Sequence, residues 1–249
     1  MNYIRQEEIR RLVEKQGLVL INELQKLYPE VSLMTIHRDL DKLQDAGYLT
    51  KIRGGARSVS QKTEVIFEGR SSENIAAKQI IAKKALMLIQ ANTCIFLDSG
   101  TTIREIARMM SDINVTVFTT GPHIAMELRQ LSQPTINICG GSLNRQTLSL
   151  SGQNTLKMLD DVNIDLAIIG VSGFSLDVGF SCGQEAEMLV KQKVIKKARK
   201  VVAVFDNSKL EKIMPYTFAT LSDFDYLIVD QKLPKEYNQA IKSLNIQLL

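Results

Sequence analysis

Apolar side chains recur at helical spacing in three short segments at the start of the chain. The first segment ends near Gly17, and the second covers residues 21–28. The third covers residues 32–46, where Ser32 can cap the first amides and Gly47 suits the left-handed residue that ends a helix. The inward positions are Ile4, Ile9, Leu12 and Val13 in the first helix and Ile36, Leu40 and Leu43 in the third. The pattern predicts three helices around one small core.

The opposite face of the third helix is polar and basic, and a hairpin follows it. Residues 48–51 predict a strand, and residues 53–57 predict a glycine-containing turn with a returning strand. Helix, helix, turn, helix and hairpin is the order of a winged helix-turn-helix, whose last helix enters the DNA major groove while the wing lies along the backbone. The wing is basic, with no acid between Lys51, Arg53, Arg57 and Lys62. The candidate DNA-contacting residues are Ser32, Met34, Thr35, His37, Arg38, Lys51, Arg53 and Arg57.

Two other interpretations of this segment stay open. A helix with one apolar and one polar face is also typical of an ordinary surface helix. A winged helix could instead serve only protein contacts, although the basic wing and Arg38 would then have no purpose.

The rest of the chain alternates between apolar strands and helices. Residues 58–72 predict a linker, and residues 73–90 predict the helix that opens a second domain. Further strands are predicted at 93–97, 115–119, 135–139, 166–170, 201–205 and 226–229, with helices at 102–110, 122–131, 185–199 and 235–244. This alternation predicts an α/β fold with a mainly parallel sheet covered on both faces. The predicted organisation is a DNA-binding domain over 1–57, a linker over 58–72 and an α/β domain over 73–249.

Small polar residues follow several of these strands, at the sheet edge where α/β proteins bind ligands. Residues 98–102, Asp-Ser-Gly-Thr-Thr, lead from a strand into a helix, whose first amides and hydroxyls form a cradle suited to phosphate. The candidate effector-binding residues at this and neighbouring strand ends are Asp98, Ser99, Gly100, Thr101, Thr102, Thr119, Thr120, Gly140, Gly141 and Lys209. Each loop alone would also fit a tight turn, Asp98 could simply cap one, and Lys209 could be a solvated surface residue.

Length and composition limit the number of domains and the class of protein that the chain can form. The chain has 249 residues, of which 45% are hydrophobic, enough for two packed domains. A charged start and the absence of a long uncharged apolar run argue against a signal peptide and a membrane span, so we expect a cytoplasmic protein. The net charge of +4 permits nucleic-acid binding without requiring it. Cys94, Cys139 and Cys182 suit reduced thiols, and with two histidines in the chain we expect neither a metal site nor another cofactor.

These motifs resemble the DeoR family of bacterial transcriptional regulators. The family's recognition-helix signature matches residues 31–40 and its Arg-x-x-Gly-Gly-Ala-like wing matches the segment around 53–56, while His37 stands where the family usually has Arg. The family's sensor motifs match residues 98–102, 140–141, 165–179 and 206–209, and Thr120 stands where many members have Asn. The resemblance implies a ribose-5-phosphate-isomerase-like sensor domain that binds a phosphorylated sugar, and double-stranded operator DNA as the other partner. It suggests a repressor of sugar-metabolism genes, which we expect to act as a homo-oligomer, a dimer or a tetramer.

An enzyme is the rival interpretation: a sugar-phosphate isomerase with an accessory domain. Such chemistry needs a carboxylate base, which in the isomerases lies in a Gly-Ala-Asp-Glu-like segment after a strand. The matching residues here are Gly170, Val171, Ser172 and Gly173, without a carboxylate. Asp177 and Glu185 lie nearby in sequence but outside that motif. The sequence therefore favours a binding site over a catalytic one.

Overall fold

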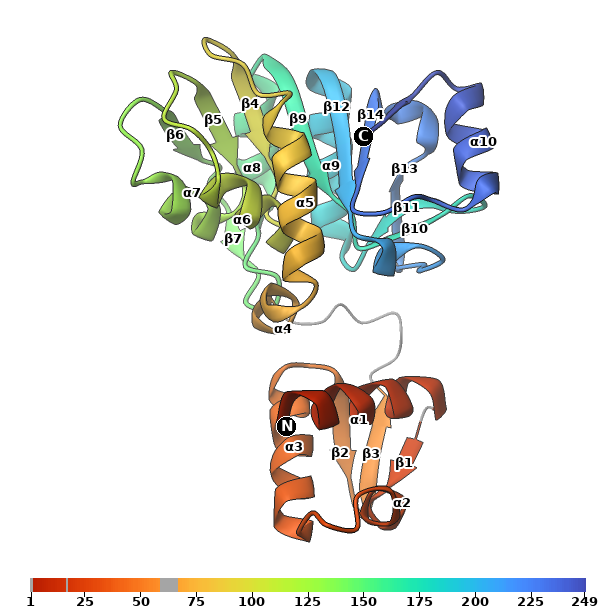
Figure 1. The fold of residues 1–249 in the computed structure, drawn as a ribbon. Helices are drawn as coiled ribbons and strands as arrows, with labels where there is room; N and C mark the ends of the chain where they lie inside the picture. Colours follow the sequence, from red (N-terminus) through yellow and green to blue (C-terminus); the bar gives the residue numbers. More distant parts are fainter. Residues whose placement is uncertain (1, 17, 59–66) are drawn as a thin grey trace. The chain divides into compact units, whose positions relative to one another are not determined.

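The computed structural model describes residues 2–16, 18–58 and 67–249, and the chain divides into two compact units, Met1–Arg70 and Ser71–Leu249 (Figure 1). Lys62 of the predicted wing lies outside the described residues. No helix among the described residues is long and apolar enough to cross a membrane.

The first unit has the predicted order of helices followed by a hairpin. Its elements are α1 (Asn2–Gln16), β1 (Leu18–Leu20), α2 (Ile21–Leu27), α3 (Leu33–Asp45), β2 (Leu49–Ile52) and β3 (Gly55–Ser58). The strands form an antiparallel sheet in the order β1-β3-β2. The sequence does not predict β1, because three residues are too few to show a strand period.

The core of the first unit joins all three helices to the sheet. Its buried members include Ile9 and Val13 of α1, Leu24 of α2 and, from α3, the predicted stripe of Ile36, Leu40 and Leu43. The prediction for Ile4 is wrong, since this side chain is 65% exposed. Its neighbour Arg5 takes the position facing α3 and bonds to Asp39.

A further helix, α4 (Phe67–Ser72), follows the residues that are not described. It falls at the end of the predicted linker, which is therefore partly helical. Phe67 is 4% exposed. One buried aromatic residue in a six-residue helix gives too short a pattern to distinguish it from a linker.

The second unit is built on a seven-stranded parallel sheet in the order β15-β14-β12-β9-β4-β5-β6. The strands of this sheet and most of the helices of the unit are, in chain order, α5 (Ile75–Leu86), β4 (Cys94–Leu97), α6 (Thr101–Arg108), β5 (Thr116–Thr119), α7 (Pro122–Leu128), β6 (Thr135–Ile138), β9 (Ile164–Gly170), α9 (Glu185–Lys197), β12 (Ala198–Phe205), β14 (Tyr226–Val229), α10 (Lys235–Ser243) and β15 (Gln247–Leu248). The predicted α/β fold with a mainly parallel sheet is confirmed.

Helices cover both faces of this sheet, as Figure 1 shows. One hydrophobic cluster joins α5, α6 and α7 to one face. The other cluster joins α8 (Gln153–Asp160), α9 and α10 to the opposite face. From β4 the strands continue through β5 to β6 on one side, and from β9 they continue through β12 to β14 on the other. The neighbouring strands β4 and β9 therefore mark the point where the strand order reverses, which is the usual ligand position in such sheets.

Several elements of the second unit have no counterpart in the sequence prediction. They are α8, the hairpin of β7 (Ser142–Leu143) and β8 (Leu150–Ser151), and an antiparallel sheet of β10 (Gly173–Ser175), β11 (Gly179–Cys182) and β13 (Tyr216–Ala219). The strands are two to four residues long, and β13 pairs with a strand far from it in sequence. Pairing of this kind leaves no local period to detect.

The buried face of α5 (Ile75–Leu86) includes a charged residue. Ile75 and Ile80 are 46% and 43% exposed, whereas Lys78 is buried beside Ile81, Ala82 and Ala85. Apolar residues lie on all sides of this helix, so spacing alone does not identify the face that packs.

Candidate DNA-binding and effector sites

The predicted recognition helix α3 begins at its expected cap. The backbone amide of Thr35 donates to Ser32 Oγ over 3.2 Å, and Gly47, just past the helix, has the left-handed φ of 79°. Ser32, Met34 and Arg38 are exposed, while Thr35 and His37 are half-buried. Met34 is 68% exposed, although it is apolar. An apolar residue with basic neighbours at the start of such a helix suits contact with base edges and phosphates.

The wing is a tight hairpin whose backbone requires glycine at two positions. Gly54 has a φ of 82°, which favours glycine. A Cβ on Gly55 would lie 2.4 Å from the carbonyl oxygen of Val19, so β1 leaves no room for a side chain there. Arg53 and Arg57 are exposed. Lys51 Nζ forms an ion pair with Asp41 of α3, an attachment of wing to helix that sequence spacing does not reveal.

A buried carboxylate fixes the orientation of α3. Asp39 is 2% exposed and accepts from Arg5 Nε over 2.6 Å and from Gln6 Nε2 over 2.7 Å. Both donors belong to α1, so the two helices are joined by polar bonds as well as by the core. The sequence interpretation assigned no role to Asp39; its signal is a carboxylate directly before Leu40, on the apolar side of the helix.

In the second unit, the predicted effector residues follow β4, β5, β6 and β12, and parallel strands bring these ends to one edge of the sheet. Lys209 follows β12, which is separated from β4 by β9 alone. Two strand spacings place these two strand ends roughly 10 Å apart. One small phosphorylated molecule is long enough to extend from one to the other.

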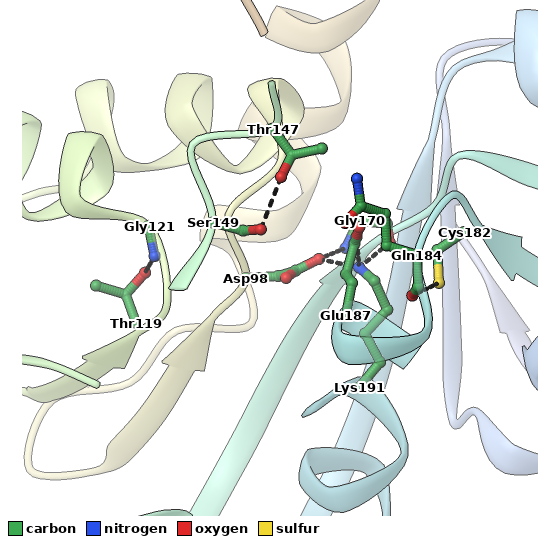
Figure 2. A network of polar contacts seen from close by, with 10 residues as sticks. All are labelled: Asp98, Thr119, Gly121, Thr147, Ser149, Gly170, Cys182, Gln184, Glu187 and Lys191. Atoms are coloured by element: carbon green, nitrogen blue, oxygen red, sulfur yellow. Dashed lines mark hydrogen bonds and ion pairs between the residues drawn. The ribbon is translucent and has the colours of Figure 1, made fainter. Parts of the chain in front are cut away.

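Asp98 lies at the strand-order reversal and is held by two donors. It is 2% exposed, and its Oδ2 accepts from the backbone amide of Gly170, at the end of β9, over 3.0 Å. The same oxygen forms an ion pair with Nζ of Lys191 from α9, and Figure 2 shows the two side chains pointing toward each other. Nζ of Lys191 also donates to the Gly170 carbonyl over 2.9 Å. The ends of β4 and β9 are thus joined through one lysine.

Lys191 is buried among acids. Its side chain is 2% exposed, and Nζ lies 3.1 Å from Oε1 of Glu187, one turn earlier in α9. Burial alone would lower the pKa of Lys191, but the charges of Asp98 and Glu187 outweigh it and hold the pKa above its usual value. The lysine is therefore charged at neutral pH, and the three groups together carry a formal charge of −1. The sequence interpretation did not include Lys191 or Glu187; their signal is a Glu and a Lys four residues apart, next to the buried positions Val190 and Val194.

Three buried hydroxyls lie at the start of α6. Ser99, Thr101 and Thr102 are 5%, 7% and 8% exposed. Within the described ranges 2–16, 18–58 and 67–249, none of these hydroxyls has a hydrogen-bond partner. Gly100 is the N-cap residue and offers no side chain to cap the helix. Free hydroxyls and free amides at one helix start form a donor-rich site suited to an oxyanion.

The other predicted loops are more structural than expected. Thr119 is fully buried, and its Oγ1 accepts from the Gly121 amide over 3.0 Å, which fixes the turn (Figure 2). Thr120 is 2% exposed, and its carbonyl accepts from Leu150 of β8. A Cβ on Gly141 would lie 2.4 Å from the Ser151 carbonyl oxygen, whereas Gly140 has open space. The glycine pair is thus explained in part by packing against the β7–β8 hairpin.

That hairpin brings further polar groups that the sequence interpretation did not include. Thr147 and Ser149 are buried and their hydroxyls lie 2.7 Å apart (Figure 2). Asn144 donates to Gln184, just before α9, over 2.6 Å. Local sequence gives no signal for them, because their placement depends on a loop folding back over Thr120. Among the residues that the structure describes, no group of three or more His, Cys, Asp or Glu side chains could hold a metal ion.

Residues 73–231 match the sequence profile of the DeoR C terminal sensor domain, and residues 5–62 match that of the DeoR-like helix-turn-helix domain. The chain belongs to the DeoR family. The resemblance seen in the motifs is confirmed. As a DeoR-family member the chain is a DNA-binding transcriptional regulator and not an enzyme, and its sensor domain implies a small-molecule effector.

Relatives of this DeoR-family chain match it along nearly its whole length. It is 32% identical over 246 residues to an uncharacterized HTH-type transcriptional regulator of Haemophilus influenzae, covering 98% of this chain and 95% of the relative. It is 30% identical over 249 residues to a putative aga operon transcriptional repressor of Escherichia coli O157:H7, covering 98% and 92%. A ribose 5-phosphate isomerase A from Methanocaldococcus jannaschii aligns with 56% of each chain at 20% identity and a TM-score of 0.42.

Proposed function

We propose that this DeoR-family regulator is a repressor of sugar-metabolism genes whose operator binding is controlled by a phosphorylated sugar. The observation that carries the proposal is that the buried carboxylate of Asp98 lies next in sequence to the hydroxyls at the start of α6, which have no hydrogen-bond partner among the described residues. Both lie at the point where the strand order reverses. A carboxylate recognises sugar hydroxyls, and a helix start recognises phosphate. Two relatives are named repressors, which supports repression over activation as the regulatory role of this chain.

Charge indicates how such a ligand would lie. Asp98, Lys191 and Glu187 together carry a formal charge of −1, which disfavours an anionic group beside them. The sugar hydroxyls therefore belong over Asp98. The phosphate belongs at Ser99, Thr101 and Thr102 or at Lys209, where donors and positive charge are available. Thr120, Gly140 and Gly141 would border the sugar.

On the DNA side, we assign α3 to the major groove and the wing to the phosphate backbone. Arg38, Arg53 and Arg57 are exposed cations that can neutralise phosphates, and Met34 and His37 are placed for base edges or phosphates. Ser32 caps the helix by accepting from the Thr35 amide, and the Ser32 and Thr35 hydroxyls lie 2.9 Å apart at its start. Lys51 can reach a phosphate if it exchanges its partner Asp41.

A homo-oligomer would place two such helices on two half-sites of double-stranded operator DNA. The sugar phosphate would bias the arrangement in which both half-sites are bound. Thermodynamic reciprocity then requires that operator DNA weaken sugar-phosphate binding by the same factor. Access to operator DNA and to phosphorylated sugars implies a cytoplasmic location.

Calorimetric titration of the full chain tests the effector class. The titrants are D-ribose 5-phosphate, D-glucose 6-phosphate and D-fructose 6-phosphate, each beside its unphosphorylated sugar, and inorganic phosphate. We expect at least one sugar phosphate to bind, and to bind more tightly than both its sugar and inorganic phosphate. Equal affinity for a sugar and its phosphate ester would contradict a phosphate site at either place, the start of α6 or Lys209.

A further inference from the structure

Asn74 connects the start of the second unit to the effector edge of the sheet. The unit begins at Ser71, and Asn74 is the residue immediately before α5. Its Nδ2 donates to Asp206 Oδ1 over 3.1 Å and to Ser208 Oγ over 3.2 Å. Asp206 and Ser208 belong to the loop after β12 that carries Lys209. Asn74 is thus the fourth residue of the unit, and it is bonded directly to the loop predicted to bind the effector.

The conformation of Asn74 is unusual for a residue that precedes a helix. An asparagine there normally has an extended backbone and caps the helix with its own side chain. Asn74 instead has a left-handed backbone, with φ 50° and ψ 35°, and makes no side-chain cap bond to α5. A left-handed non-glycine residue is strained and persists where its surroundings hold it. Here the two bonds to the Lys209 loop supply that hold.

The acceptor in this contact is an electrostatically sensitive group. Asp206 is 2% exposed; its Oδ1 also accepts from the Ser208 amide over 3.0 Å, while its buried Oδ2 has no partner among the described residues. Burial raises the pKa of Asp206, but Lys209, the Ser208 hydrogen bonds and Lys78 outweigh it and the pKa lies below its usual value. Lys78 lies in α5, one turn after Asn74. The Asp206 carboxylate is therefore stabilised both by Lys209 of the effector loop and by Lys78 in the first turn of α5.

We propose that Asn74 is a positioning residue that couples occupation of the Lys209 loop to the conformation of the chain entering the second unit. A phosphate that draws Lys209 toward itself weakens the attraction between Lys209 and Asp206. The Asp206 carboxylate and Ser208 then shift, and the bonds that hold Asn74 left-handed are lost. The backbone before α5, which is covalently continuous with α4 and the DNA-binding unit, is released into a different conformation. This inference rests on the proposed function, because it needs a phosphate-bearing effector at that edge.

The test compares two asparagine-to-glycine variants of the full chain. Asn74→Gly deletes the contact while glycine accepts the same left-handed backbone. Asn92→Gly is the matched control: Asn92 has φ 61°, its side chain bonds to Asn114 over 2.9 Å, and it lies before β4, at the opposite edge of the sheet. A second variant, Asn74→Asp, keeps the size of the side chain and replaces the donor with a carboxylate beside Asp206. Thermal unfolding shows that each variant is folded.

The readout is the ratio of operator affinities without and with a sugar phosphate. Operator DNA comes from upstream of the protein's own gene, and the probes are D-ribose 5-phosphate, D-glucose 6-phosphate and D-fructose 6-phosphate. For the wild type and Asn92→Gly we expect a ratio of about tenfold or more for the active probe. For Asn74→Gly and Asn74→Asp we expect that probe still to bind, with a ratio within about twofold of one.

Other outcomes separate the two proposals. If Asn74→Gly keeps the wild-type ratio, the coupling role is wrong and the proposed function stands. If the folded variant loses the probe altogether, Asn74 belongs to the ligand site and does not act as a coupling residue. If the wild type itself neither binds nor responds to any probe, the proposed function fails, and this inference fails with it.

Discussion

Lys191 and Asp98 lie 93 positions apart in the sequence and form a buried ion pair at the point where the strand order reverses. The pair joins α9 to the end of β4 and, through the Gly170 carbonyl and amide, to β9. It holds in place the carboxylate that the sequence marks as the ligand acceptor. This relationship adds Lys191 to the proposed effector site, although it follows none of the strand ends.

Replacing Lys191 by methionine should destabilise the second unit. The change leaves Asp98 and Glu187 buried without their cation, and loss of one partner of a buried pair costs about 3 to 5 kcal/mol. Chemical denaturation at neutral pH, followed by circular dichroism, measures the loss. The double variant Lys191→Met/Asp98→Asn should recover part of it, because one stranded charge is removed. A single variant as stable as the wild type would show that the pair is dispensable for folding.

Replacing Arg38 by alanine should weaken operator binding and leave sugar-phosphate binding unchanged. Removal of a charge-assisted contact to DNA lowers affinity by about 1.5 to 3 kcal/mol. Fluorescence anisotropy with labelled operator DNA at fixed salt measures this loss. Arg11→Ala is the control, since Arg11 is an exposed cation of α1, 75% exposed and paired with Glu7. Equal losses in both variants would indicate a general charge effect and no specific role for α3.

Replacing Thr101 by valine should weaken the binding of the sugar phosphate and leave operator binding unchanged. Valine keeps the shape of the side chain and removes a hydroxyl that has no partner within the described residues, at a cost of about 1.5 to 3 kcal/mol in ligand affinity. Calorimetric titration measures it. Thr116→Val, at the start of β5 and so at the other edge of the sheet, serves as the control. Unchanged affinity in Thr101→Val would exclude the α6 start as the phosphate site.

Replacing His37 by arginine should strengthen DNA binding and its salt dependence. His37 is half-buried on α3, and a guanidinium is a permanent cation that binds phosphate in a bidentate manner. If the residue contacts a phosphate, the slope of log affinity against log salt should steepen by about 0.9. Operator binding at several salt concentrations gives that slope. An unchanged slope with altered sequence preference would assign position 37 to a base edge.

Local chemistry explains which parts of this fold the sequence could predict. The Ser32 cap and Gly47 define α3 within one turn, and the apolar runs define the parallel strands, because burial on both faces leaves an uninterrupted signal. The short strands β1, β10, β11 and β13 depend on partners distant in sequence and give no such signal.

The same distinction holds for the candidate sites. Asp98 to Thr102 follow a strand and begin a helix, so their place at the ligand edge is local information. Three other residues can be assigned a role only from their contacts in the structure. Lys191 contacts Asp98, Asp39 contacts Arg5, and Asn74 contacts Asp206. For each of these three residues, its position in the helical pattern predicts only packing or solvent exposure.

We propose that a phosphorylated sugar controls operator binding. The most direct measurement is the affinity of the purified full chain for DNA from upstream of its own gene, at fixed salt, with and without each sugar phosphate of the panel. We expect specific binding that one sugar phosphate weakens by about tenfold or more, and that the matching free sugar leaves unchanged. Specific binding that no sugar phosphate alters would contradict control of this regulator by a phosphorylated sugar.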